Sequence, residues 1–406
     1  MLRMRALSLR QFSNLSHARR ISVLPTHIIF RVADSTGVLT RVTVSADVQY
    51  SSFGIAFCSA GYGKGKVVRS VLYIRRDWSH KGIGTYFRRN ILTEFYGQDG
   101  FFEAALDAGF SVSRMSASKV LANPHLISDY DAIVVNSRQH PKISLYELLT
   151  RLSKSAKGPL VLFVSTPSPE DLPGDDVLER CDMIVKREPF RDFSRYRLRV
   201  RNLDKIRPTM LACHLVKARR GKLPNVEQLV ARNYGRSVPL RYDVFFSGIA
   251  SNRVRFETWQ RVIKMGVNQV GGIQQKPEEI LLPPDHPING PKMSRRRYLK
   301  VARESRINLA LDGVGPFTYR HLELWCVGAF MLSTPGIREI ITPMRFQEGV
   351  HYVAFNDIDD MEDKIRYYLE HEGERRAIAE AGQKMFIEEY NIRRHAEQIR
   401  SWLSTI

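Results

Sequence analysis

One segment near the carboxyl end of the chain, residues 306–334, constrains the fold most strongly. An apolar run at 307–311 leads into a loop rich in glycine and proline at 312–316. A helix is expected at 318–326, and a second apolar run follows at 329–333. Two buried strands joined through a helix are typical of a parallel α/β sheet. The free N–H groups at the start of that helix, and the positive end of its dipole, predict an anion-binding site beside the loop.

Two charged residues on the expected helix, Arg320 and Glu323, can share the mouth of one crevice because they lie about one turn apart. A guanidinium and a carboxylate together suit an oxygen-rich anionic ligand such as a nucleotide diphosphate. Thr318 and Tyr319 could add hydroxyl and backbone N–H contacts to phosphate. The alternative is an i,i+3 ion pair on the surface, which contributes only about 0.2–0.5 kcal/mol.

The sequence Glu-Leu-Trp-Cys-Val-Gly at 323–328 resembles the Glu-Ala-Met-Ala-x-Gly segment of GT-B glycosyltransferases. The Arg-x-x-Glu opening, from Arg320 to Glu323, is similar to the CgeB-like (spore-maturation) branch and more distantly to exostosins. The resemblance covers about residues 240–400. It implies that Glu323 accepts hydrogen bonds from the donor's ribose hydroxyls and that Arg320 neutralises phosphate.

One position departs from the pattern of many retaining GT-B enzymes. These enzymes have a second glutamate eight residues before the equivalent of Glu323, where this chain has Gly315. Retention and inversion of the sugar's configuration therefore both stay open.

The order of predicted elements indicates an α/β protein of the GT-B class, with two Rossmann-like domains whose parallel sheets face a central cleft. Expected strands of the first domain are at 71–74, 132–135, 160–164 and 183–186, and those of the second begin at 242–246 and 267–271. Four parts are expected: an N-terminal extension (1–66), an acceptor-side domain (67–200), a linker (201–240) and a nucleotide-sugar-binding domain with closing helices (241–406).

The extension allows two interpretations. Residues 1–20 contain five arginines and no acidic residue, which resembles an organellar transit peptide. An over-extended reading frame is the alternative, and we favour it because the first core strand begins only near residue 71. Residues 27–57 alternate as strands do but have no evident place in either domain.

The loop after the first strand of the second domain supplies further donor-site candidates, Gly248, Asn252 and Arg253. Gly248 permits close approach of a ligand to the backbone. Either Arg253 or Arg255 could provide positive charge to a diphosphate. The alternative is a helix start with Ser251 or Asn252 as its N-cap, and the two roles are compatible.

The loop after the first strand of the first domain is the candidate catalytic segment. Asp77 or His80 could act on an acceptor hydroxyl, and Gly82 and Gly84 could let the backbone approach the acceptor. The alternative is an ordinary turn between strand and helix.

No metal or other cofactor is expected besides the nucleotide-sugar co-substrate. Asp357 and Asp359 match an Asp-x-Asp metal motif, but they lead directly into a predicted helix, so capping explains them better. Scattered cysteines suggest a reducing compartment, and the cytoplasm is the expected location, or an organelle if residues 1–20 are a transit peptide.

The net charge of +20 implies an anionic partner. Nucleotide phosphates and peripheral contact with an anionic membrane both fit, whereas no recognised nucleic-acid module accompanies the basic residues. The predicted function is glycosyl transfer from a nucleotide sugar to an unknown glycan, lipid or protein acceptor. The alternative is a non-catalytic nucleotide- or sugar-binding protein, or a basic protein associated with nucleic acid or membrane, with the same fold.

Overall fold

The computed structural model describes residues 27–33, 39–45, 68–75, 94–95, 97–138, 143–275, 283 and 285–406. The chain forms two compact units, residues 1–64 and 65–406. In the first unit, β1 (His27–Ala33) and β2 (Leu39–Ser45) pair as an antiparallel hairpin, with His27 opposite Ser45. The alternating pattern therefore does mark strands there.

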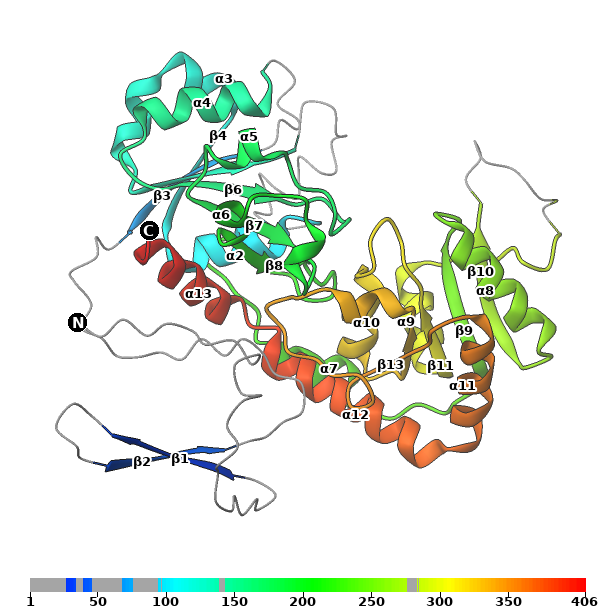
Figure 1. Ribbon diagram of the computed structural model, residues 1–406. Coiled ribbons are helices and arrows are strands. Elements are labelled where there is room, and N and C mark those ends of the chain that lie inside the picture. Colours follow the sequence, from blue (N-terminus) through cyan, green and yellow to red (C-terminus); the bar gives the residue numbers. More distant parts are fainter. Residues whose placement is uncertain are drawn as a thin grey trace. The chain divides into compact units, whose positions relative to one another are not determined.

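The second unit contains two parallel sheets (Figure 1). In the described residues the first sheet has six strands in the order β4-β3-β5-β6-β7-β8. Their bounds are β3 Ser70–Ile74, β4 Ser111–Met115, β5 Ala132–Asn136, β6 Leu160–Val164, β7 Met183–Arg187 and β8 Ile206–Thr209. The central strands are continuous apolar runs because helices cover both faces of a parallel sheet. The edge strand β8 lies in the range expected as a linker, and its Pro208 is tolerated at a sheet edge.

The second sheet has five strands in the order β10-β9-β11-β12-β13. Their bounds are β9 Tyr242–Ile249, β10 Gln269–Gln274, β11 Ser305–Ala310, β12 Met331–Ser333 and β13 Val353–Ala354. All neighbouring pairs in both sheets are parallel. The predicted fold class, α/β with two Rossmann-like domains on the GT-B plan, is confirmed.

Helices connect the strands in chain order. Those of the first domain and the following connection are α2 Gly100–Gly109, α3 Ala117–Ala122, α4 Leu145–Ser155, α5 Asp175–Leu178, α6 Val200–Leu203 and α7 Val226–Tyr234. Those of the second domain and the closing segment are α8 Arg253–Lys264, α9 Arg295–Arg303, α10 Tyr319–Val327, α11 Ile358–Glu370, α12 Glu372–Glu389 and α13 Ile392–Ser404. No helix among the described residues is long and apolar enough to cross a membrane.

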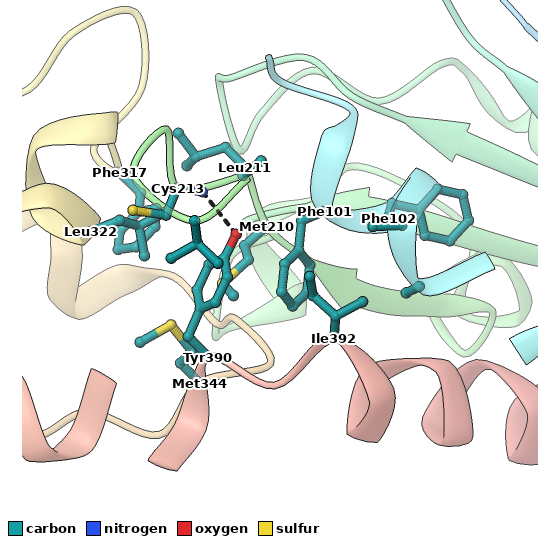
Figure 2. Packing of buried hydrophobic residues seen from close by; sticks show 14 of the residues in the cluster. Phe101, Phe102, Met210, Leu211, Cys213, Phe317, Leu322, Met344, Tyr390 and Ile392 are labelled. Carbon is teal, nitrogen blue, oxygen red and sulfur yellow. Dashed lines mark hydrogen bonds between the residues drawn. The ribbon is translucent and has the colours of Figure 1, made fainter. Parts of the chain in front are cut away.

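The two domains share a hydrophobic core. Figure 2 shows Phe317 and Leu322 on one side of Tyr390 and Phe101 on the other. The Tyr390 hydroxyl accepts a hydrogen bond of 2.8 Å from the backbone N–H of Cys213. Helix α13 then packs against α2 of the first domain. The closing segment thus returns to the first domain and fixes the two sheets relative to one another.

Candidate active site

A cavity of about 670 Å³ lies between the two domains, at the carboxyl ends of their strands. Ligands of open α/β sheets bind at these ends, and the volume is within the range of small-molecule sites. The first domain contributes Gln98, Pro167, Arg187 and Leu211. The second contributes residues of the β9–α8 loop, of the loop 313–318 and of helices α9 and α10.

Helix α10 begins at the cavity, and a buried histidine fixes its first turn. The N–H of Thr318 donates to Nδ1 of His321 (3.1 Å), while Nε2 lies 3.0 Å from the hydroxyl of Ser333. Burial, with the charge of Arg320 nearby, lowers the pKa of His321 to about 3. The ring is therefore neutral, and because Nδ1 accepts a hydrogen bond, its proton is on Nε2. The predicted anion site is a rigid helix start lined by Thr318, Tyr319 and Arg320.

Arg255 lies on the cavity wall and is buried, with 8% of its surface exposed. Its Nε donates to the carbonyl of Asp312 (2.7 Å) and its Nη1 to that of Ile249 (2.8 Å). Burial lowers the pKa of Arg255 to about 10, and the charge of Arg320 acts in the same direction. The guanidinium holds two loops together while keeping its charge.

Arg320 lies beside it, over the ring of Phe246 at 4.5 Å. Its Nη2 donates to the carbonyl of Ser247, and its Nε lies 3.3 Å from the hydroxyl of Tyr298. Its Nη1 is buried and has no hydrogen-bond partner among the described residues. Among the described residues no carboxylate forms an ion pair with Arg320 or Arg255, and the carboxylate of the nearby Asp312 acts on Arg255 only through its charge, raising the pKa of the guanidinium.

Glu323 is 8% exposed and does not pair with Arg320. Its Oε1 accepts a hydrogen bond from Nη2 of Arg295, the first residue of α9, and lies 3.6 Å from Nδ1 of His214. Its Oε2 makes no hydrogen bond with the described residues. Arg320 and Glu323 both line the cavity, as the sequence predicts. Among the described residues they do not form an i,i+3 ion pair with each other.

The structure of the β9–α8 loop decides which of the two candidates, Arg253 or Arg255, lines the cavity. Asn252 is the N-cap of α8, since its Oδ1 accepts from the N–H of Arg255 (3.1 Å), and its Nδ2 donates to the carbonyls of Asp312 and Gly313 at 3.0 Å each. The side chain of Arg253 is 87% exposed, pairs with Glu257 and does not line the cavity. Among these candidates Arg255, and not Arg253, brings charge to the site.

Gly248 lies where a side chain would displace the arginines. A Cβ there would be 2.9 Å from the ring of Phe246, 3.2 Å from Nη2 of Arg320 and 3.3 Å from Nη1 of Arg255. The close approach expected of Gly248 is thus made by the two guanidinium groups.

Gly315 has a steric explanation. A Cβ at this position would lie 1.9 Å from the carbonyl oxygen of Pro167 in the first domain, a distance that no side chain can adopt. A glutamate at 315 is therefore incompatible with the observed contact between the loops.

The candidates Asp77, His80, Gly82 and Gly84 lie outside the described residues. Sequence reasoning also missed Gln98 and Arg187, which line the cavity from the first domain. Arg187 is the last residue of β7, directly after the strand predicted at 183–186. Ligands bind near the carboxyl ends of parallel strands, so this position in the sequence was the signal that pointed to Arg187.

The Asp-x-Asp motif is a helix cap, as expected. Oδ1 of Asp357 accepts hydrogen bonds from the N–H groups of Asp359 (3.0 Å) and Asp360 (2.9 Å) at the start of α11. In the part of the chain that the structure describes, no group of three His, Cys, Asp or Glu side chains could hold a metal ion.

Comparison with known proteins adds one finding about the sequence. Residues 268–401 match a family model described as glycosyl transferase-like. Most of the second domain is therefore similar in sequence to this family. This match begins just before β10 and ends within α13, so it includes the helix α10 with Arg320 and Glu323. No curated protein gives a significant sequence match.

Three solved structures are similar to this chain, and two of them are named as a glucosyltransferase or a glycosyltransferase. HepE of Anabaena, in complex with UDP and glucose, is 13% identical with a TM-score of 0.49, and the match covers 83% of this chain and 100% of that one. A glycosyltransferase from Rickettsia africae is 12% identical (TM-score 0.48; 83% and 98% covered). The DNA-modifying β-glucosyltransferase is 11% identical (TM-score 0.47; 82% and 99% covered). These values are too low to transfer functional residues, so the site itself must indicate the chemistry.

Proposed function

We propose that this protein is a glycosyltransferase that moves a sugar from a nucleotide-diphosphate donor to an acceptor hydroxyl without a bound metal. The observation that carries the proposal is the pair of cavity-lining guanidinium groups, Arg255 and Arg320, which form no ion pair with a carboxylate of the described residues. The diphosphate of a nucleotide sugar carries two negative charges, which these two groups would balance. The glycosyl transferase-like sequence of residues 268–401 supports the same assignment.

The remaining donor contacts follow from the same geometry. Oε2 of Glu323 is an open acceptor for ribose hydroxyls, while Arg295 holds the other carboxylate oxygen. The ring of Tyr319, stacked on His214 at 3.8 Å, offers a flat surface at the cavity. Within GT-B enzymes, Arg320-x-x-Glu323 favours the CgeB-like branch.

The proposed reaction breaks the bond between the anomeric carbon and the diphosphate oxygen. The bonding electron pair leaves with the diphosphate, the acceptor oxygen bonds to the anomeric carbon, and the acceptor hydroxyl gives its proton to a general base, for which Asp77 and His80 are the candidates. Negative charge thus develops on the leaving oxygen, where Arg255, Arg320 and the N–H groups of α10 are already positioned to stabilise it. The shared core limits how far the domains separate, so water would be largely excluded once the donor is bound.

The proposal also includes membrane contact, the class of acceptor and the location in the cell. Arg296 and Arg297 on α9 are exposed, so peripheral contact of this helix with an anionic membrane is part of the proposal. The acceptor could be a glycan, a lipid or a protein, and nucleic acid is a less favoured partner. The cytoplasm is the proposed location.

Titration calorimetry with UDP, GDP and CMP, followed by donor hydrolysis over the matching nucleotide sugars, tests the function. We expect one nucleoside diphosphate to bind and Arg255→Gln to weaken that binding at least about 10-fold, the scale of a hydrogen bond to a charged group. Arg253→Gln, in the same helical turn but outside the cavity, is the matched control. Absence of binding by any nucleotide or nucleotide sugar would overturn the proposal, and binding without hydrolysis or transfer would favour a non-catalytic protein of this fold.

A further inference from the structure

The first domain presents two polar side chains, Gln98 and Arg187, to the cavity that also contains Arg255 and Arg320. Gln98 lies just before α2, and Arg187 is the last residue of β7. The amide oxygen of Gln98 is buried and accepts no hydrogen bond from the described residues. A buried acceptor without a donor is destabilising, so this atom is suited to a ligand that supplies an O–H or N–H group.

The guanidinium of Arg187 is held in one orientation. Its Nε donates to Oε2 of Glu188 (2.5 Å), and its Nη1 donates to the carbonyl of Ser165 (3.3 Å). The other oxygen of Glu188 accepts from the backbone N–H of Leu211 (2.9 Å). Nη2 of Arg187 has no hydrogen-bond partner in the described residues, so it is the end available to a ligand in the cavity.

The residues that hold Arg187 in place are in energetically unfavourable states. Glu188 is fully buried and has a backbone φ of 42°, a value that residues other than glycine rarely adopt. Its neighbour Lys186 is also fully buried, and its Nζ donates to the carbonyls of Thr166 (3.0 Å) and Ser168 (2.9 Å). Strained backbone and buried charge at the carboxyl end of a strand are features of functional sites. Burial lowers the pKa of Lys186 to about 7 and raises that of Glu188.

The charge of the donor does not require Arg187. Arg255 and Arg320 already match the donor's diphosphate from the second domain, whereas Arg187 and Gln98 belong to the opposite wall. A second anionic group, on the other substrate, would meet Arg187 there. The assignment of Arg187 to the acceptor rests on the proposed function.

We propose that the acceptor is a hydroxyl compound that also carries a carboxylate or phosphate, with Arg187 binding the anionic group and Gln98 accepting a hydrogen bond from a hydroxyl. Glu188 is a positioning residue that orients Arg187. Uronic acids and sugar phosphates share this chemistry, and neutral sugars lack it.

Matched pairs of sugars test the proposal with the full-length protein saturated with UDP. Affinities are measured by calorimetry for glucuronate, galacturonate and glucose 6-phosphate, beside glucose and galactose. We expect at least one charged sugar to bind about 10-fold or more tightly than its neutral parent, the difference expected from a hydrogen bond to a charged group. Equal affinity within every pair, or binding by none of the charged sugars, would overturn the proposal.

Variants assign the effect to Arg187. Arg187→Gln should abolish the preference for the charged sugar while leaving UDP affinity within about 2-fold. Glu188→Gln should reduce the preference in the same way, which a purely structural residue would not do selectively. Arg138→Gln is the matched control, because Arg138 also donates to the carbonyl of Ser165 (2.9 Å) but does not line the cavity. Preference retained in Arg187→Gln would overturn the proposal, and a parallel loss of UDP affinity would assign Arg187 to the donor. UDP is replaced by whichever nucleoside diphosphate binds the wild-type protein, and binding of none would instead contradict the proposed function.

Discussion

Gly315 of the second domain lies against the carbonyl of Pro167 in the first, so closely that a Cβ would come within 1.9 Å of the oxygen. Both residues line the cavity. The contact joins the loop that precedes α10 to the loop that follows β6. The width of the cleft at this point is therefore set by the absence of a side chain at residue 315.

Gly315→Ala should force these two loops apart. We expect the free energy of unfolding to fall by about 1–3 kcal/mol, the usual cost of inserting atoms into a packed region, and affinity for the nucleoside diphosphate to fall as well. Gly373→Ala is the control, because nothing in the described structure lies within 4 Å of a Cβ at Gly373. Denaturant unfolding and calorimetry of both variants check this. Unchanged stability and affinity in Gly315→Ala would show that the loops adjust freely.

Arg320→Lys should weaken binding of the nucleoside diphosphate by about 1.5–3 kcal/mol, because an ammonium cannot reproduce the paired donors of a guanidinium. The melting temperature without ligand should change little, because the side chain faces the cavity and a lysine keeps the positive charge and can still donate to the carbonyl of Ser247. Calorimetry and thermal unfolding of the same sample measure both quantities. A large fall in melting temperature with normal affinity would make Arg320 a structural residue.

Glu323→Gln should weaken nucleoside diphosphate binding by about 1.5–3 kcal/mol if the carboxylate holds the ribose hydroxyls. Arg295→Gln is informative beside it, because Arg295 donates to Oε1 of Glu323. We expect a smaller loss in Arg295→Gln, through poorer orientation of the carboxylate. Affinity for UDP compared with that for its 2′-deoxy analogue is the measurement, and both variants should reduce the difference. An undiminished difference in Glu323→Gln would place the ribose elsewhere.

Stability should fall as the pH decreases, owing to two buried histidines. Burial lowers the pKa of His321 to about 3 and that of His395 to about 4. Between about pH 6.5, where an unfolded histidine takes up its proton, and about pH 4, each ring is neutral when folded and charged when unfolded. The unfolded state therefore binds more protons, and each histidine should lower the free energy of unfolding by about 1.4 kcal/mol per pH unit as the pH falls.

Urea unfolding at several pH values measures this dependence. His395→Gln should be less stable at neutral pH, because it loses the contact with Thr209 (3.0 Å), but its stability should depend less steeply on pH. Identical slopes for the variant and the wild type would contradict a neutral, buried His395.

Activity should survive excess chelator. The Asp-x-Asp motif that begins at Asp357 caps α11, and the described residues contain no cluster of metal ligands. Transfer or donor hydrolysis measured with and without EDTA tests the proposal. Loss of activity that manganese restores would assign the phosphate charge to a metal ion and not to the arginines.

The strands and the start of helix α10 could be predicted because their signals are local. Buried parallel strands are apolar runs, and Gly-Pro before a helix marks its free N–H groups whatever surrounds it. The choice between Arg253 and Arg255 was not local. The position of Asn252 as N-cap sets the helix register, which turns Arg253 toward solvent and Arg255 toward the loop at Asp312.

The partners of Glu323 and the surroundings of Arg187 depend on contacts between distant segments. Arg295 reaches Glu323 across 28 residues, and Glu188 is held by Leu211 across 23. Composition and spacing carry no signal for such pairs. The strand β8 escaped prediction because Ile-Arg-Pro-Thr is short, polar and contains proline, features that only an edge position permits.

The return of α13 to the first domain has a practical consequence for engineering. Because residues after Tyr390 pack on α2, the two domains cannot be exchanged with those of another enzyme through a single junction. A chimera that exchanges the second domain alone needs one junction after β8 and a second near Asn391, with α13 retained from the parent of the first domain.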